Sequence, residues 1–493
     1  MRTTAPMESA YDYVIICGGT AGLVLQLANR LSENSENTVL VIEAGEGATA
    51  DPRMIVPGLF PSALTSELNW NFATVPQVRL DGRCIGHYQG KALGGSSAIN
   101  AQALIPFRAS DIDAWEKLVW DSAFASLGYP LTASPFSGKP SGPYIAPSTV
   151  VCCNCPLCPS GSQRNLRVLT GAVVNKIILG KRDGKQAAIG VPYAIAGTIL
   201  TTRANNEIIL SAGVFNSPKT FELRGIGDPK VLKVAGAPCL VDNKYIGTNL
   251  QDHIQAGISF EAVDGFPTGD HLLRGDSAAI SAAQQQYAKN QSGPLASSGV
   301  TEFAYIPTVD FKSDTAKSHH MEDLKSAAPT HPLDAARVER LIDLIENGDE
   351  GTSRQLHHPL CGTFASTIHW FRITSLDVND PPAIDRKYLS TPLISTFTPP
   401  NGKRNDPLAF INGSLDRAKS YAKAASTTYW HSVSTVAMAP QDKGGIVDNS
   451  LKIYGVSGLR VFDASVFPLI PLGNTQSPVY SLAERAVDLI KQE

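Results

Sequence analysis

The chain has 493 residues, of which 43% are apolar and 18% are charged, and its net charge is −3. This length and composition predict a globular protein of two or three domains. They argue against nucleic-acid binding, because there is no basic excess, and against a membrane span, because no apolar run is long enough. The first ten residues contain no apolar run typical of a secretion signal, so we expect a cytoplasmic protein.

The first predicted element is a strand–turn–helix–strand unit over residues 11–45. Its turn, residues 17–22, reads Cys-Gly-Gly-Thr-Ala-Gly. A glycine turn ahead of a helix lets backbone N–H groups approach a phosphate; Gly19 permits the close approach, and Gly22 lets the helix pack on the strand. Glu43 ends the second strand, where a carboxylate can accept hydrogen bonds from ribose hydroxyls. The unit predicts a dinucleotide site.

Cys17 stands where the usual fingerprint has its first glycine. That glycine serves the tight turn rather than the approach of phosphate, and a cysteine is small enough to fit if its φ is negative. We therefore expect Cys17 to be buried at the strand end with negative φ, at a cost of about 1 kcal/mol. A positive φ would indicate a broken turn.

A second glycine-rich turn follows at residues 89–100, which read QGKALGGSSAIN. Together with the first turn it resembles the pattern G-K-x-L-G-G-S-S-x-I-N of the glucose–methanol–choline (GMC) oxidoreductases, which bind FAD. Residues 169–177, 207–227 and 246–253 resemble further family motifs, and they occur in the family's order. The resemblance covers most of the chain and implies that FAD is the cofactor.

The resemblance also assigns cofactor-binding residues. It places the backbone of Val174 against the adenine, residues 463–464 on the flavin side of the dinucleotide, and the N–H groups that begin the last helix toward the flavin ring. The full expected set is Gly19, Thr20, Ala21, Gly22, Glu43, Ala44, Gly94, Gly95, Ser96, Asn100, Ala101, Gln102, Ala103, Val174, Asp463, Ala464, Thr475 and Gln476.

The catalytic pair implied by the resemblance is His431 and Asn474. His431 lies in YWHSVSTVAM, at residues 429–438, where the family has a histidine that faces the flavin. A neutral imidazole suits the removal of a hydroxyl proton while hydride leaves carbon. The amide of Asn474 can hydrogen-bond the substrate oxygen and orient it without taking a proton.

These residues imply an FAD-dependent alcohol dehydrogenase or oxidase, most similar to fungal aryl-alcohol and secondary-metabolism members of the family. The expected substrate is a primary alcohol on a small, aromatic or polyketide-like molecule, and the expected electron acceptor is oxygen or a quinone. Two alternatives stay open: a cyclase or lyase that keeps FAD without a redox step, and an inactive, shortened homologue. The sequence does not give the oligomeric state.

The predicted fold class is α/β, with a Rossmann-like FAD-binding domain and a substrate domain in which helices flank an antiparallel sheet. We expect the FAD-binding domain to be discontinuous, over residues 10–110, 165–255 and 425–493. Residues 256–424 would form the substrate domain, with a strand at 366–373 and an amphipathic helix at 333–348.

Residues 116–164 form an irregular segment in which the family match weakens and tens of residues are missing after Leu118. It contains four cysteines within seven residues, Cys152, Cys153, Cys155 and Cys158. Zinc coordination is chemically feasible for four thiolates, but the spacing is too compressed for two facing C-x-x-C pairs and no partner pair exists elsewhere. We therefore predict no metal site.

Overall fold

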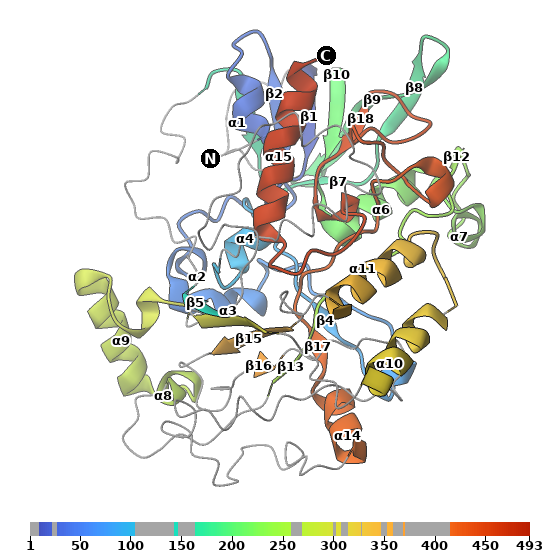
Figure 1. The fold of residues 1–493 in the computed structure, drawn as a ribbon. Helices are drawn as coiled ribbons and strands as arrows, with labels where there is room; N and C mark the ends of the chain where they lie inside the picture. The colour runs from blue at the N-terminus through green and yellow to red at the C-terminus, as the bar shows by residue number, and fades with distance from the viewer. Residues whose placement is uncertain are drawn as a thin grey trace.

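The computed structural model contains two main sheets, one above the other in the orientation of Figure 1. The structure describes residues 9–21, 27–103, 142–145, 163–257, 269–298, 302–306, 314–326, 328–346, 353–357, 368–369 and 415–493.

The larger sheet has eight strands in the order β6-β2-β1-β10-β9-β7, with β18 paired to β10 and β8 paired to β9. Neighbouring strands from β6 to β10 run parallel, as does β18, whereas β9 runs antiparallel to β10. Its strands are β1 Ala10–Ile16, β2 Val39–Ile42, β6 Leu166–Leu169, β7 Ala172–Val174, β8 Ile178–Arg182, β9 Lys185–Ile195, β10 Thr198–Leu210 and β18 Leu459–Val461.

The apolar runs of β1 and β2 explain why these strands lie at the centre of the sheet. All four residues of β2 and the last three residues of β1 are buried. Continuous burial of this kind is typical of parallel strands that are covered on both faces. Helices α1 (Leu27–Ser32) and α15 (Gln476–Lys491) lie side by side over one face (Figure 1), where Arg30 of α1 pairs with Glu484 of α15.

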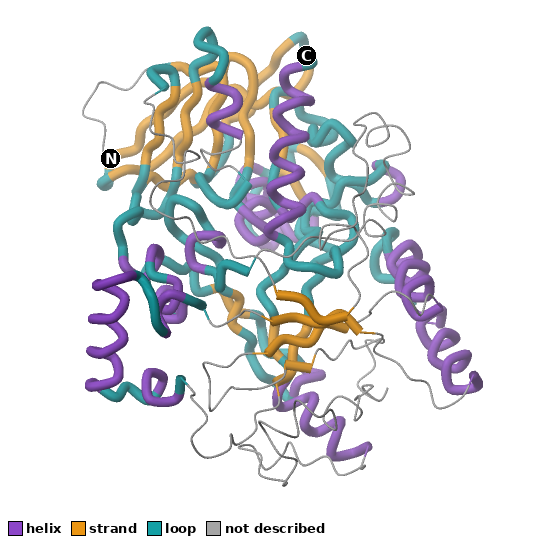
Figure 2. The backbone as a smooth tube through the Cα atoms, turned by 60° about the vertical axis from the view of Figure 1, so that its left-hand side comes forward, coloured by secondary structure: helices purple, strands orange, loops and turns teal. Residues whose placement is uncertain are grey.

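The smaller sheet is antiparallel, in the order β17-β13-β16-β15-β14-β5, and Figure 2 shows it as a second layer separate from the first. Its strands are β5 Gly142–Ile145, β13 Ile254–Gly257, β14 Glu302–Ile306, β15 Ser353–His357, β16 Ile368–His369 and β17 Thr427–Thr428. The helices around it are α8 Asp270–Leu273, α9 Ser277–Asn290, α10 Asp314–Ser326, α11 Asp334–Glu346 and α14 Leu415–Ala425.

This architecture confirms the predicted fold class and the helix expected at 333–348, which is α11. Of the strand expected at 366–373, the structure describes two residues, and these form β16. The segment expected to be irregular contains β5, which pairs with β14. The four clustered cysteines lie outside the described residues, and the domain boundaries stay a prediction.

The remaining described elements lie between these strands and helices along the chain. They are α2 Pro52–Ile55, η1 Pro57–Leu59, α3 Phe60–Leu64, β3 Phe72–Ala73, η2 Val78–Leu80, β4 Gly86–His87, α4 Ser96–Ile99, α6 Gly213–Arg224, β11 Ile226–Gly227, α7 Pro229–Val234, β12 Val241–Asp242, η5 Pro294–Ala296, η7 Gln441–Lys443 and η8 Ala464–Val466. Among the described helices, none has both the length and the apolar character needed to cross a bilayer.

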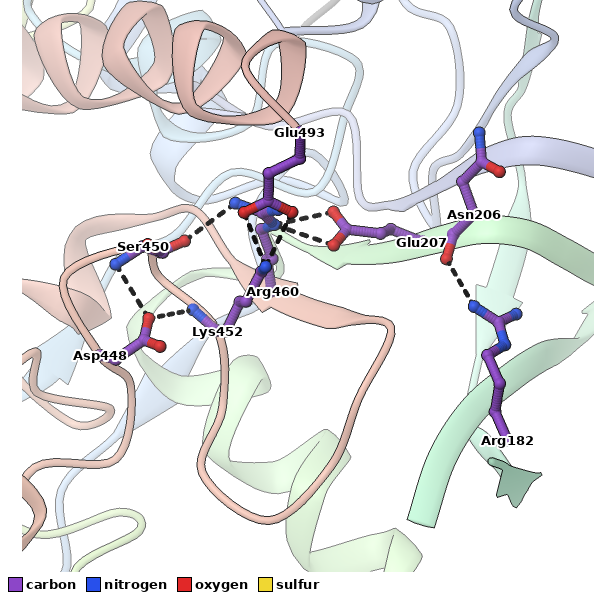
Figure 3. A network of polar contacts seen from close by, with 8 residues as sticks. All are labelled: Arg182, Asn206, Glu207, Asp448, Ser450, Lys452, Arg460 and Glu493. Carbon is purple, nitrogen blue, oxygen red and sulfur yellow. Dashed lines mark hydrogen bonds and ion pairs between the residues drawn. The ribbon is translucent and has the colours of Figure 1, made fainter. Parts of the chain in front are cut away.

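A buried arginine fixes the end of α15 to the large sheet (Figure 3). Arg460 of β18 is 1% exposed, and its Nε lies 2.8 Å from an Oε of Glu207 in β10. Its guanidinium also pairs with Glu493. The carboxylate of Glu493 forms a second ion pair with Nζ of Lys452, 2.6 Å away. Burial raises the pKa of Glu207, while the positive charge of Arg460 opposes the rise.

Candidate active site and cofactor-binding loops

The glycine turn after β1 is held against the end of β2 by the carboxylate of Glu43. The amide of Gly18 donates to Oε2 of Glu43 at 2.7 Å, and the amide of Gly45 donates to Oε1 at 2.8 Å. Glu43 is 1% exposed, and burial raises its pKa although these hydrogen bonds oppose the rise. The side chain that we expected to bind ribose therefore holds the turn together, and contact of Glu43 and of the neighbouring Ala44 with a cofactor stays a prediction.

Cys17 differs from the prediction, because its φ is +80° and it is half-buried rather than buried. The negative φ was wrong: the chain reverses at the strand end in the left-handed region, which glycine adopts freely and other residues enter at a cost. The turn is nevertheless intact, since the Cys17 amide donates to the Ile42 carbonyl at 2.8 Å and the Ser211 hydroxyl donates to the Cys17 carbonyl at 2.9 Å.

The thiol of Cys17 donates to Oε2 of Glu43 at 3.2 Å. Burial and the neighbouring carboxylate raise the pKa of this thiol well above its ordinary value. The sulfur therefore stays protonated and serves as a hydrogen-bond donor, with little thiolate character. Cys17, which stands in place of the first glycine of the fingerprint, therefore adds backbone strain and one hydrogen bond to Glu43.

The Gly/Ser loop packs directly on the glycine turn, backbone against backbone. The amide of Gly94 donates to the Gly18 carbonyl at 2.8 Å, and the amide of Ser97 donates to the Thr20 hydroxyl at 3.2 Å. Gly95 has φ +52°, and a β-carbon placed there would lie 2.6 Å from Cα of Gly19. Only glycine can occupy position 95 at this distance from Gly19. The structure therefore brings together the two loops that we expected to bind the cofactor.

The cradle formed by these loops fits the pyrophosphate of a dinucleotide. A β-carbon at Gly19 would be in ordinary van der Waals contact with Cα of Gly95 and with the Ser211 carbonyl oxygen, both 3.9 Å away, so Gly19 lies where the turn meets the Gly/Ser loop. Ala21 is buried beneath the turn. Backbone amides without side chains in front of them are what phosphate binding requires. Gly22 lies outside the described residues.

The loop that carries Asn474 is tied to the end of the Gly/Ser segment. The side chain of Asn474 donates to the Ala103 carbonyl at 3.1 Å, and Asn100 donates to the side chain of Gln476 at 2.8 Å. Thr475 and Gln476 begin α15, as expected. The oxygen of Asn100 also accepts from the Gln102 amide at 2.9 Å, so the stretch from Asn100 through Ala101 to Ala103 is joined to the start of α15. Ser96 begins α4 on the same segment.

Other predicted cofactor residues have structural partners of their own. The carboxylate of Asp463 accepts hydrogen bonds from the amide of Gly213 at 3.0 Å and the hydroxyl of Ser217 at 2.6 Å, so it caps the start of α6. The Ala464 carbonyl accepts from the amide of Ser434 at 3.2 Å. Val174 ends β7, opposite Tyr193 of β9. Their contacts with a cofactor stay a prediction.

His431 follows a strained residue. Trp430 has φ +57°, an unfavourable conformation for a bulky side chain, and strain of this kind clusters at functional sites. The Trp430 ring stacks on Tyr88 with centroids 5.0 Å apart, and its indole N–H donates to the Gly86 carbonyl at 3.1 Å. The backbone next to His431 is therefore fixed in an otherwise disfavoured geometry.

His431 belongs to a polar cluster that the sequence analysis missed. At its centre lies Asp252, whose oxygens accept from the amide of His431 at 3.0 Å and the hydroxyl of Ser432 at 2.8 Å. The ring Nδ1 of His87 lies 3.5 Å from Asp252. We call the residues His87, Asp252, His253, Thr428, His431 and Ser432 the Asp252 cluster.

Burial shifts the pKa values of Asp252 and His87 toward their uncharged forms. Burial raises the pKa of Asp252, against hydrogen bonds from Thr428 and Ser432 that lower it. Burial lowers the pKa of His87, against the attraction of Asp252. The signal for this cluster was present in the sequence as the Asp-His pair that ends the motif at residues 246–253.

The amide of His431 donates to Asp252, whereas the side chain of Asn474 donates to the Ala103 carbonyl, so each residue is anchored on a different loop. A sheet with a parallel core and paired glycine loops, together with an antiparallel sheet that carries a half-buried histidine cluster, defines a dinucleotide-binding oxidoreductase of the flavoprotein class. The chain belongs to the GMC oxidoreductase family. Family profiles described as GMC oxidoreductase match residues 154–255 and 397–483.

Individual relatives agree with the family. The GMC oxidoreductase family protein Mala s 12 of Malassezia sympodialis is 30% identical, over 98% of this chain and 92% of the relative. Dehydrogenase citC of Monascus ruber is 28% identical, over 99% and 97%. The first alignment extends over 580 positions, whereas this chain has 493 residues, so the relative contains tens of residues that this chain lacks.

Solved structures share the fold. An FAD-dependent oxidoreductase from Chaetomium thermophilum is 23% identical with a TM-score of 0.79, over 98% of this chain and 99% of that chain. A fungal aryl-alcohol oxidase is 20% identical with a TM-score of 0.76, over 99% of each chain. The family membership and the cradle together identify FAD as the cofactor of this oxidoreductase.

Proposed function

We propose that this protein oxidises a primary alcohol of a small, aromatic or polyketide-like molecule. His431 accepts the hydroxyl proton, and Asn474 orients the substrate oxygen. The relatives named as dehydrogenases and the structural neighbour named as an aryl-alcohol oxidase support this substrate class. Oxygen or a quinone then accepts the electrons.

One observation supports the proposal most directly: the side chain of Asn474 is hydrogen-bonded to the loop that forms the FAD cradle. Its amide donates to Ala103, and the adjoining segment packs through Gly94 and Gly95 onto the glycine turn. A residue that orients substrate against the cofactor has to be positioned relative to it within a fraction of an ångström. A short, hydrogen-bonded connection between the two provides this precision.

FAD, when bound, supplies the hydride acceptor. The residues of this chain supply the other requirements of alcohol oxidation. The imidazole of His431 removes a proton from oxygen, which makes the neighbouring carbon a better hydride donor. The backbone amide of His431 donates to Asp252, which holds this residue in place on its loop.

Anaerobic rapid mixing of the purified holoprotein with a series of primary alcohols tests the proposal. We expect an aromatic alcohol to bleach the oxidised flavin absorbance, with recovery after oxygen or a benzoquinone is admitted. The matched methyl ether, which has no hydroxyl proton, should leave the spectrum unchanged. A flavin that stays oxidised while a rearranged product forms would indicate the cyclase or lyase alternative. An FAD-loaded protein that no alcohol reduces would indicate the inactive, shortened homologue.

A further inference from the structure

Two histidine rings of the Asp252 cluster contact each other through the same kind of nitrogen. Nδ1 of His253 lies 2.9 Å from Nδ1 of His431, and the rings are nearly perpendicular, at 83° with centroids 5.2 Å apart. The distance is that of a good N–H···N hydrogen bond. The two imidazoles are therefore partners.

Strand pairing produces this contact. His253 directly precedes β13, and two residues separate His431 from the end of β17. β13 and β17 pair antiparallel with Ile254 opposite Thr428, and the amide of Tyr429 donates to the His253 carbonyl at 2.9 Å. A single oxygen of Asp252 accepts from the amides of both His253 and His431, at 2.7 and 3.0 Å. Both backbones are thus fixed before any ligand binds.

The contact restricts where the protons can be. A neutral imidazole has one N–H, either at Nδ1 or at Nε2. A hydrogen bond between two Nδ1 atoms requires that one ring has its proton on Nδ1 and the other has a lone pair there. The donor ring then has its own lone pair on Nε2, whereas the acceptor ring has a proton on Nε2. The two histidines therefore have opposite tautomers, and in both arrangements the Nδ1 of His431 is occupied.

We propose that His253 is a positioning residue that accepts the Nδ1–H of His431 and so fixes His431 in the tautomer with an unprotonated Nε2. The inference rests on the proposed function in one respect: a proton acceptor needs that lone pair. The reverse arrangement would give His431 an Nε2–H, which can only donate to a substrate oxygen. Second partners that set a histidine tautomer are a general feature of sites where imidazole acts as a base.

The proton step balances with this tautomer. The O–H bond of the substrate breaks, an N–H bond forms at Nε2 of His431, and the ring becomes an imidazolium whose Nδ1–H still donates to His253. His253 gives up no proton and takes none. Tyr429 packs edge-on against His431 with centroids 4.5 Å apart, and this contact restrains the ring while the proton moves.

Nitrogen NMR of the holoprotein with ¹⁵N-labelled histidine tests the tautomer directly. Long-range ¹H–¹⁵N correlations distinguish a protonated from an unprotonated Nδ1, and the His431 signals are assigned by their absence in His431→Ala. We expect a protonated Nδ1 and an unprotonated Nε2 on His431 at a pH where the ring is neutral. In His253→Leu we expect His431 to shift toward the Nε2–H form that isolated histidine prefers. An Nε2–H on His431 of the unaltered protein would overturn the proposal.

Kinetics of the same variants give the second readout. We expect His253→Leu to lower the rate of flavin reduction by an alcohol about 10²-fold with little change in the substrate dissociation constant. In His253→Asn an amide oxygen can accept near the position of Nδ1, so most of the rate should return. The matched control is His331→Asn. His331 is a buried histidine that accepts a hydrogen bond from the amide of Leu333, and we expect its replacement to leave the kinetics unaltered.

The outcomes separate this inference from the proposed function. If no alcohol reduces the flavin, the proposed function fails, yet the tautomer of His431 is still measured. If alcohols reduce the flavin while His253→Leu leaves both the tautomer and the rate unchanged, the proposed function stands and the role of His253 is disproved. Bound FAD and the thermal unfolding midpoint are measured for each variant, so that loss of fold is recognised.

Discussion

The thiol of Cys17 lies 3.2 Å from Oε2 of Glu43, and the backbone that presents this thiol has a φ of +80°. The strain and the contact therefore belong to the same residue. Cys17→Gly removes both, whereas Cys17→Ala removes the sulfur and keeps the positive φ.

We expect Cys17→Gly to raise the free energy of unfolding by about 1 kcal/mol, because glycine adopts this backbone without penalty. Cys17→Ala should not raise it. Chemical denaturation of the three proteins with FAD bound measures the difference. Equal stabilisation by alanine and glycine would mean that the sulfur, and not the backbone, is the source of the strain.

Gly95→Ala tests the contact between the two glycine loops. The new methyl group would lie 2.6 Å from Cα of Gly19, so the Gly/Ser loop has to move away from the turn. We expect most of the bound FAD to be lost, measured as the ratio of flavin to protein absorbance. Gly184→Ala is the matched control: its φ is also positive, at +76°, but no atom lies within 4 Å of the added carbon. FAD occupancy that falls equally in both variants would assign the effect to backbone strain alone.

His431→Ala tests the proposed proton acceptor. We expect FAD to stay bound and the rate of flavin reduction by an alcohol to fall by about 10²-fold or more, because general base catalysis is lost. Asn474→Ala should lower the same rate, with a smaller effect because it removes orientation rather than proton transfer. Stopped-flow absorbance under anaerobic conditions measures both. An unaltered reduction rate in His431→Ala would remove this residue from the mechanism.

Arg460→Leu tests the buried ion pair at the end of α15. The substitution leaves Glu207 in a buried position without its partner, and breaking a buried pair costs about 3–5 kcal/mol. Lys452→Ala, which removes an exposed pair with Glu493, should cost less than about 1 kcal/mol. Urea unfolding compares the two. In the double variant Arg460→Leu/Glu207→Leu we expect partial recovery, and no recovery would show that the loss comes from packing rather than from an uncompensated charge.

Asp334→Asn tests the pH dependence of stability. Burial raises the pKa of Asp334, but hydrogen bonds from the amides of Thr330 and His331 and the charge of Arg337 leave it below its ordinary value. A lowered pKa contributes stability above the unfolded value of about 3.9, and this contribution is lost as the pH falls through the folded value.

At pH 7 we expect Asp334→Asn to destabilise the protein by about 1–3 kcal/mol, and we expect this difference to shrink as the pH falls below about 4. Urea unfolding at a series of pH values measures it. The control is Asp242→Asn, an exposed position in β12, which should leave the curve unchanged. A difference that does not vary with pH would show that the carboxylate charge has no part in it.

Local patterns predicted the elements that have local causes. The strand–turn–helix–strand pattern over residues 11–45 predicted β1 and β2, and the amphipathic pattern at 333–348 predicted α11. Backbone conformation at Cys17 could not be predicted in this way. Its amide and its carbonyl are held by Ile42 at the end of β2 and by Ser211 directly after β10, and both partners lie far away in sequence.

The sequence by itself determined the family, the FAD cofactor and the order of the cofactor-binding loops, because those depend on residue types at short spacing. Only the tertiary structure decided which side chains share a site. Asp252 and His253 are adjacent, whereas His431 lies 178 positions after His253 in sequence, and the pairing of β13 with β17 brings His431 within hydrogen-bond distance of both. Proton positions and tautomers follow from such contacts, because the energy of a buried polar group depends on the partner it meets and not on its neighbours along the chain.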